Sequence, residues 1–143
     1  MTDGGDAVLR FSPLESARFG LRVYRASVDA IDAPRIADEI ERERIDVAIL
    51  RLPATAMGGA DALAERGFAP ILADTQVVFG IEIASHAPSS PDPSIALKPA
   101  THADAALLDR MARSIFADYT SHYHANPLFA RNRILDGYAE WAA

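Results

Sequence analysis

The sequence predicts an α/β fold, in which a small mixed-sheet region is followed by one more strand and two helices. Apolar stretches of strand length alternate with segments of helical spacing in the order strand, helix, strand, helix, strand, strand. A stretch at 87–94 with three prolines and three serines then interrupts the pattern, as a linker does. We therefore expect an N-terminal α/β region over 1–86, a linker over 87–94 and a second unit over 95–143.

The first half of the N-terminal region is predicted from its periodicity. Residues 11–20 show no clear period, so we expect a loop there. Residues 19–28 alternate between apolar and polar, which is typical of a half-exposed strand. A helix is predicted to begin after Asp32, which has the chemistry of an N-cap, and to end near Arg44.

The second half of that region begins with a stretch that is apolar on both faces. Residues 47–50 read Val-Ala-Ile-Leu, and this predicts a central strand covered on both sides. Residues 60–66 predict a short helix that ends at Gly67, where a left-handed backbone costs glycine little. Two strands are expected next, over 68–72 and 76–83, with a turn between them.

In the second unit, residues 95–97 predict a short strand. Thr101 and Asp104 have the spacing of a capping box, which opens a helix. Residues 119–127 are expected to form a loop, and a last helix should begin near residue 130. The apolar stripe of the first helix is Leu107, Leu108, Met111 and Ile115, and that of the second is Ile134, Tyr138 and Trp141, which we expect in the core.

Composition excludes several classes of function. The net charge is −6, and the 14 cations form no basic run, so nucleic acid and anionic membrane surfaces are not expected partners. The chain has no cysteine, which excludes disulfides and thiolate catalysis. It contains no apolar stretch of about 18 residues, so we expect no membrane span and a cytoplasmic location.

Four short motifs, in order, give a resemblance to a known family. They are Leu-Glu-Ser-x-x-Phe-Gly at 14–20, Arg-Leu-Pro at 51–53, Gly-Phe at 67–68 and Asp-Thr at 74–75. This set resembles the N-terminal region of the dTDP-fucosamine acetyltransferases, which are N-acyltransferases of the GNAT superfamily. Residues 95–143 are similar to the first strand and first two helices of a GNAT domain. The resemblance implies transfer of an acetyl group from acetyl-CoA to the 4-amino group of a dTDP-linked deoxyaminosugar.

Two parts of a GNAT active site, the loop that binds CoA and the general acid, are not found in this sequence. GNAT enzymes hold the CoA pyrophosphate on a Gln/Arg-x-x-Gly-x-Gly/Ala loop, and no such segment occurs here. Their general acid, usually a tyrosine on a later helix, would lie beyond residue 143. We therefore expect the substrate-side portion of such an enzyme, truncated before the acetyl-CoA-binding loop and inactive alone. Acetyl-CoA would be the cosubstrate of the full-length enzyme, and this chain would bind no cofactor.

Two other functions remain open. One is a non-catalytic module that binds a small ligand or a partner chain, and the other is one half of a split acyltransferase. A homodimer or a complex with another chain is expected in either case, because an incomplete sheet leaves strand edges free to pair.

The candidate site residues are few, and none is expected to be catalytic. In GNAT enzymes the segment between the first two helices commonly lines the acceptor cleft, which makes Tyr119, Tyr123 and His124 candidates for contact with the sugar or amine. Metal binding is not expected, because His122 and His124 have no third ligand at suitable spacing.

Arg51 and Glu15 are the other polar residues of interest. Arg51 ends an apolar strand, where its guanidinium could meet a phosphate or a carboxylate of a ligand. The alternative is an internal ion pair with Glu15, Asp46 or Asp74. Glu15 belongs to the first motif and could shape a ligand site, although a structural role in capping or turning the chain is the simpler interpretation.

Overall fold

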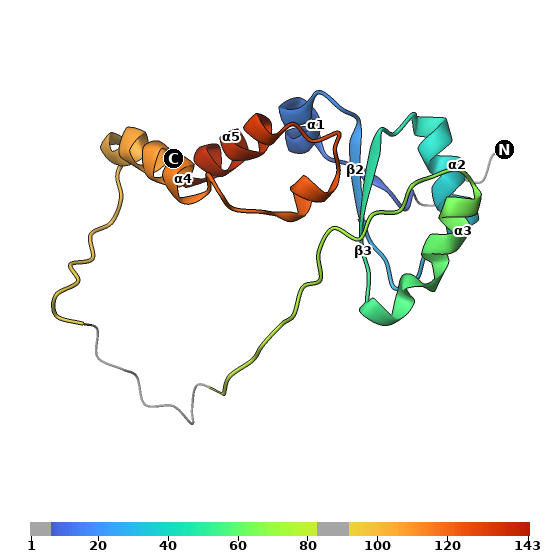
Figure 1. Ribbon diagram of the computed structural model, residues 1–143, viewed down its shortest axis with the longest axis horizontal. Coiled ribbons are helices and arrows are strands. Elements are labelled where there is room, and N and C mark those ends of the chain that lie inside the picture. Colours follow the sequence, from blue (N-terminus) through green and yellow to red (C-terminus); the bar gives the residue numbers. More distant parts are fainter. Residues whose placement is uncertain (1–6, 83–91) are drawn as a thin grey trace.

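Three strands form a mixed sheet in the computed structural model, which describes residues 7–82 and 92–143. Strand β2 (Val23–Ser27) lies in the middle. Strand β1 (Arg10–Phe11) pairs with it antiparallel, and β3 (Val47–Arg51) pairs with it parallel (Figure 1). The predicted α/β class with a mixed sheet is confirmed.

Five α-helices accompany the sheet within the described residues. Asp32 caps the second by accepting a hydrogen bond from the Arg35 backbone N–H at 3.2 Å, as its sequence predicts. Thr101 and Asp104 form the expected capping box in the turn that opens the fourth. The helices are α1 (Pro13–Phe19), α2 (Ala33–Glu43), α3 (Ala60–Glu65), α4 (Ala105–Ile115) and α5 (Arg131–Ala142).

The sheet is the middle layer of three. Helices α2 and α3 lie on one side, and α1 and α5 lie on the other (Figure 1). Side chains of β2 alternate between two apolar clusters, because successive residues of a strand point to opposite faces. Tyr24 packs with Ile36 and Leu63 toward α2 and α3, whereas Val23 packs with Phe129 and Ile134 toward α5.

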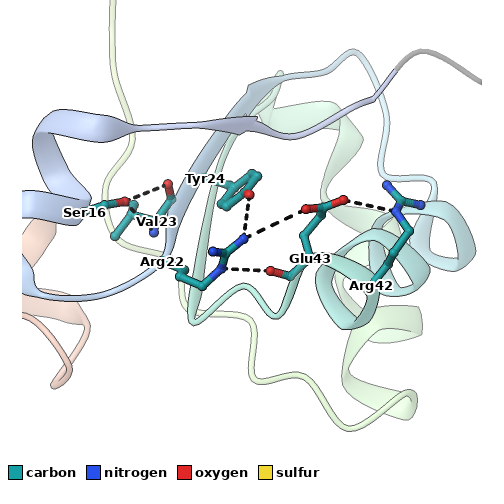
Figure 2. A network of polar contacts seen from close by, with 6 residues as sticks. All are labelled: Ser16, Arg22, Val23, Tyr24, Arg42 and Glu43. Atoms are coloured by element: carbon teal, nitrogen blue, oxygen red, sulfur yellow. Dashed lines mark hydrogen bonds and ion pairs between the residues drawn. The ribbon is translucent and has the colours of Figure 1, made fainter.

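Polar contacts stabilise the turn at residues 20–22, which connects α1 to β2 (Figure 2). The Ser16 hydroxyl donates to the Val23 carbonyl at 3.4 Å (Figure 2) and accepts from the Val23 N–H at 3.0 Å, and so joins α1 to the strand. The Arg22 guanidinium donates to the Glu43 carbonyl at 2.9 Å and to the Tyr24 hydroxyl at 3.1 Å. The bond to Glu43 places the Arg22 guanidinium at the C-terminal end of α2, where a cation is favoured.

The loop predicted over 11–20 is wrong, since residues 13–19 form α1. Pro13 occupies the first turn, where its fixed φ suits a helix and its missing N–H removes no bond. Gly20 ends the helix with φ at 70°, the left-handed conformation that glycine adopts without strain. These end signals were present, but seven residues are too few to show a helical period.

The strands predicted over 68–72, 76–83 and 95–97 are absent from the described residues. Residues 69–82 and 95–97 are exposed and pair with no strand (residue 83 lies outside the described residues). An apolar stretch becomes a strand only when a neighbour completes its hydrogen bonds and other elements cover its faces. As a consequence β3 lies at the edge of the described sheet, not at its centre, although both of its faces are partly covered.

The second unit contains both predicted helices, and their apolar stripes are incompletely covered. Leu107, Met111 and Ile115 of α4 are exposed. Tyr138 is half-buried and stacks on Phe116 with ring centroids 4.4 Å apart, but Trp141 is 85% exposed, so its predicted core position is wrong. Most of the predicted linker, 87–91, lies outside the described residues.

Candidate functional site

A hollow of about 600 Å³ opens on the α1 and α5 side of the sheet, where the carboxyl ends of β2 and β3 are left uncovered. The amino ends of the same strands are covered, because Val23 and Val47 pack against Phe129 and Ile134. Crevices at the carboxyl ends of parallel strands are common ligand sites in α/β proteins. The lining residues from the three strands are Arg10, Phe11, Arg25, Ala26, Ser27, Ile49 and Arg51.

Strand register brings three arginines to one face of the sheet beside this hollow. Arg10 of β1 lies directly opposite Arg25 of β2. Ser27 lies two residues beyond Arg25, so both point to the same face, and Arg51 of β3 is the partner of Ser27. The three guanidinium groups therefore come from three adjacent strands and line one cavity.

The charges of these arginines are only partly balanced. Arg25 lies 3.3 Å from the Glu15 carboxylate. Arg10 and Arg51 form no ion pair with any residue in 7–82 or 92–143. Like charges placed directly opposite on paired strands are destabilising, and the Glu15 carboxylate offsets only one of the two charges of the Arg10–Arg25 pair. The hollow therefore carries an excess of positive charge that suits an anionic ligand.

Glu15 lies behind the lining of the hollow rather than in it. Its side chain projects from α1 and is 2% exposed. The Ser12 hydroxyl donates to it at 2.6 Å, and the Tyr123 hydroxyl donates to its other oxygen. With Arg25, the carboxylate has three partners, which is the condition under which a charge can be buried at low cost.

Tyr123 reaches Glu15 from the short 3-10 helix His122–Ala125, which lies between α4 and α5. Its ring packs against both Phe19 and Phe129, with centroid separations of 5.5 and 5.4 Å. Burial and, second to it, the hydrogen bond to the Glu15 carboxylate together raise the pKa of the Tyr123 hydroxyl to about 12. The phenol is therefore a proton donor to Glu15 at neutral pH and no base.

The structure separates the four predicted site residues. Arg51 lines the hollow, and Tyr123 is connected to it through Glu15 and Arg25. Tyr119 instead contacts the rings of Phe116 and Tyr138. His124 accepts at Nδ1 from the Ser121 backbone N–H at 3.0 Å and serves as a helix cap. Neither Tyr119 nor His124 is among the lining residues.

The alternative ion pair for Arg51 is not formed with any of its three expected partners. Glu15 pairs with Arg25. Asp46 accepts from the Arg22 N–H at 2.7 Å, and Asp74 lies 3.6 Å from His122. The Arg51 guanidinium is thus left facing the hollow.

Sequence reasoning missed Arg10 and Arg25. Arg25 could have been found from the alternation in β2. That alternation places residue 25 on the same face of the strand as Val23 and Ser27, two residues before the strand ends. Arg10 carried no comparable signal, since β1 has two residues and its pairing depends on the unpredicted helix α1.

The described residues contain no group of three or more histidine or acidic side chains placed to hold a metal ion. None of their helices combines the length and apolar character that crossing a membrane requires.

No protein-family model matches the chain, and no significant match was found among curated proteins or solved structures.

Proposed function

We propose that this chain binds a nucleotide-linked deoxyaminosugar in the arginine-lined hollow, as the substrate-side portion of a GNAT-type N-acetyltransferase. The observation that carries the proposal is the set of three arginines around one cavity, two of which have no carboxylate partner in the described chain. Guanidinium groups recognise phosphates through paired, charge-assisted hydrogen bonds. A sugar nucleotide presents a diphosphate with two negative charges, and Arg10 and Arg51 offer two unpaired positive charges.

The resemblance to the dTDP-fucosamine acetyltransferases names the reaction class. The sugar amine attacks the thioester carbonyl of acetyl-CoA, the C–N bond forms, the C–S bond breaks and CoA leaves as the thiol. Residues of this chain would hold the acceptor, and holding one reactant in place lowers the entropic part of the barrier. The acetyl-CoA loop is not found in this sequence, so acetyl transfer by the chain alone is not expected.

Calorimetric titration with dTDP-glucose tests the proposal, with CoA as a second anionic probe. We expect dTDP-glucose to bind and CoA to bind far more weakly, because the loop on which GNAT enzymes hold the CoA pyrophosphate does not occur in this sequence. Replacing Arg51 with Met should raise the Kd for dTDP-glucose about tenfold or more, since a hydrogen bond to a charged group contributes about 1.5–3 kcal/mol.

Arg110→Met is the matched control. Arg110 is an exposed arginine on α4 and is not among the lining residues, so the variant loses the same charge elsewhere. It should bind dTDP-glucose as the unmodified chain does. Equal weakening by both substitutions would show a general charge effect and would contradict the proposal, as would binding of CoA in preference to dTDP-glucose.

A second candidate function is the binding of a partner chain. It is favoured by the exposed apolar residues at 77–81, where Val78 is 92% exposed and Phe79 is 89% exposed. Apolar surface of this kind commonly marks an interaction site, and an extended segment can pair with a strand of another chain.

A further inference from the structure

The buried carboxylate of Glu15 lies next to the lining of the hollow and contacts one of its three arginines. Four features describe its surroundings: it lies behind the hollow, it is 2% exposed, it receives hydroxyl donors from Ser12 and Tyr123, and it lies 3.3 Å from Arg25. The Arg25 side chain is 43% exposed, so one part of it meets Glu15 and another part faces the cavity. Glu15 therefore touches the hollow through two of its lining residues, Arg25 and Ser12, and Arg25 is the charged one.

We infer that Glu15 is a positioning residue, which holds the Arg25 guanidinium in the orientation that a phosphate group of the ligand requires. An unrestrained arginine loses the freedom of several rotatable bonds when it binds. A carboxylate that is itself fixed by two hydroxyl donors removes part of that freedom before the ligand arrives. The inference rests on the proposed function, because it assigns the ligand-facing role of Arg25 to the same hollow.

The alternative to positioning is a simple charge effect. The two explanations predict opposite changes in anion affinity when Glu15 is replaced with Gln. If Glu15 acted only as a negative charge near the hollow, Glu15→Gln would strengthen anion binding, because a repulsive charge would be removed. If Glu15 positions Arg25, Glu15→Gln weakens anion binding, because the guanidinium loses its charged partner. Positioning should prevail, since Arg25 lies between Glu15 and the cavity and shields the ligand from the carboxylate.

The experiment measures the affinity of the Glu15→Gln chain for dTDP-glucose by calorimetry and the mobility of the Arg25 Nε–H group by NMR. We expect the Kd to rise about tenfold and the Nε–H signal, restrained in the unmodified chain, to become mobile. Asp109→Asn is the matched control: it removes a carboxylate 3.1 Å from Arg113 on α4 and should change neither quantity. An unchanged or lower Kd in Glu15→Gln would overturn the inference.

Tyr123→Phe gives a second route if Glu15→Gln does not fold. It keeps the carboxylate charge and removes one of its hydroxyl donors, so it should raise the Kd a few-fold and partly release the Arg25 Nε–H group. An Nε–H group as restrained in Tyr123→Phe as in the unmodified chain would count against positioning. If the unmodified chain binds no dTDP-glucose, the proposed function fails, and the NMR comparison alone then decides the role of Glu15.

Discussion

Two buried carboxylates hold the chain around β1, and each does so by accepting hydrogen bonds. Glu39 of α2 accepts from the backbone N–H groups of Val8 and Leu9 at 3.0 and 3.2 Å. Glu15 of α1 accepts from Ser12 and Tyr123 and pairs with Arg25. A buried charge without partners is costly, so these residues fix where β1 runs. The position of Arg10 in the hollow follows from that path.

Tyr123 should make stability depend on pH at high pH. Its pKa is raised to about 12 in the folded chain, compared with about 10 in an unfolded one. The folded state therefore holds the proton more tightly, and its advantage is complete below pH 10. That advantage is lost as the pH rises through about 10 to 12.

The measurement is the urea midpoint as a function of pH for the unmodified chain and for Tyr123→Phe. The midpoint of the unmodified chain should fall between pH 10 and 12, and the fall should be smaller in the variant, which has no phenol to ionise. Parallel curves for the two chains would show that Tyr123 does not carry this linkage.

At the scale of elements, the approach of the Ala54–Gly59 turn to residue 31 depends on a glycine. A Cβ added at Gly59 would lie 2.5 Å from the Ile31 Cβ and 2.8 Å from the Ile31 carbonyl oxygen. Crowding against backbone typically costs about 1–3 kcal/mol, which exceeds the gain of up to about 1 kcal/mol from reduced unfolded-state entropy. Gly59→Ala should therefore destabilise the chain by about 1–2 kcal/mol.

Gly58 offers the matched control, because a Cβ there meets nothing within 4 Å. Gly58→Ala should be neutral or slightly stabilising in the same urea titration. Equal destabilisation by the two substitutions would mean that the cost comes from the turn conformation and not from contact with Ile31.

The elements differ in how well sequence alone predicts them, and the reason is physical. Helices α2, α3, α4 and α5 were predicted because caps and a helical period are local signals. A strand needs partners, so the apolar stretches at 68–72, 76–83 and 95–97 predicted strands whose pairing the described chain does not supply. Of the hollow, only Arg51 was predicted, because Arg10 and Arg25 join it through strand register.

Packing of helix α5 should stabilise the sheet as well as the helix itself. Ile134 is 3% exposed and packs with Val23 and Val47 of the sheet. Ile134→Ala should therefore destabilise the chain by about 2–5 kcal/mol, the usual cost of emptying a packed position. Urea unfolding monitored through amide exchange of Val23 to Ser27 tests whether the sheet itself is affected.

Trp141→Ala is the control on the same helix. It removes a larger side chain, but one that is 85% exposed, so it should change stability by no more than about 0.5 kcal/mol. A stable sheet in Ile134→Ala would show that α5 docks without supporting β2 and β3.

At the scale of the whole molecule, apolar side chains are distributed unevenly between core and surface. Two buried clusters lie on either side of the sheet. Outside them, residues 69–82 follow helix α3 as an extended segment that runs away from the sheet (Figure 1). Its residues 69–81 make no backbone hydrogen bond to one another or to other described residues. Large apolar side chains on it are exposed, including Leu72, Val77, Val78, Phe79 and Ile81.

Such a segment should associate with a second copy of the chain when the concentration is high. Unpaired backbone groups and consecutive apolar side chains favour strand pairing between molecules. We expect amides of 69–81 to exchange rapidly at low micromolar concentration, while those of Val23 to Ser27 exchange slowly. At high micromolar concentration the exchange of 69–81 should slow, and sedimentation should show a dimer.

Two lysine substitutions in the same segment separate apolar association from a general effect of charge. Val78→Lys places a charge within the apolar run and should abolish both the dimer and the slowing of exchange. Thr75→Lys adds the same charge at a polar position in the segment and should leave both in place. If exchange of 69–81 is slow at every concentration in a monomeric chain, these residues pair within one molecule, and association through this segment is contradicted.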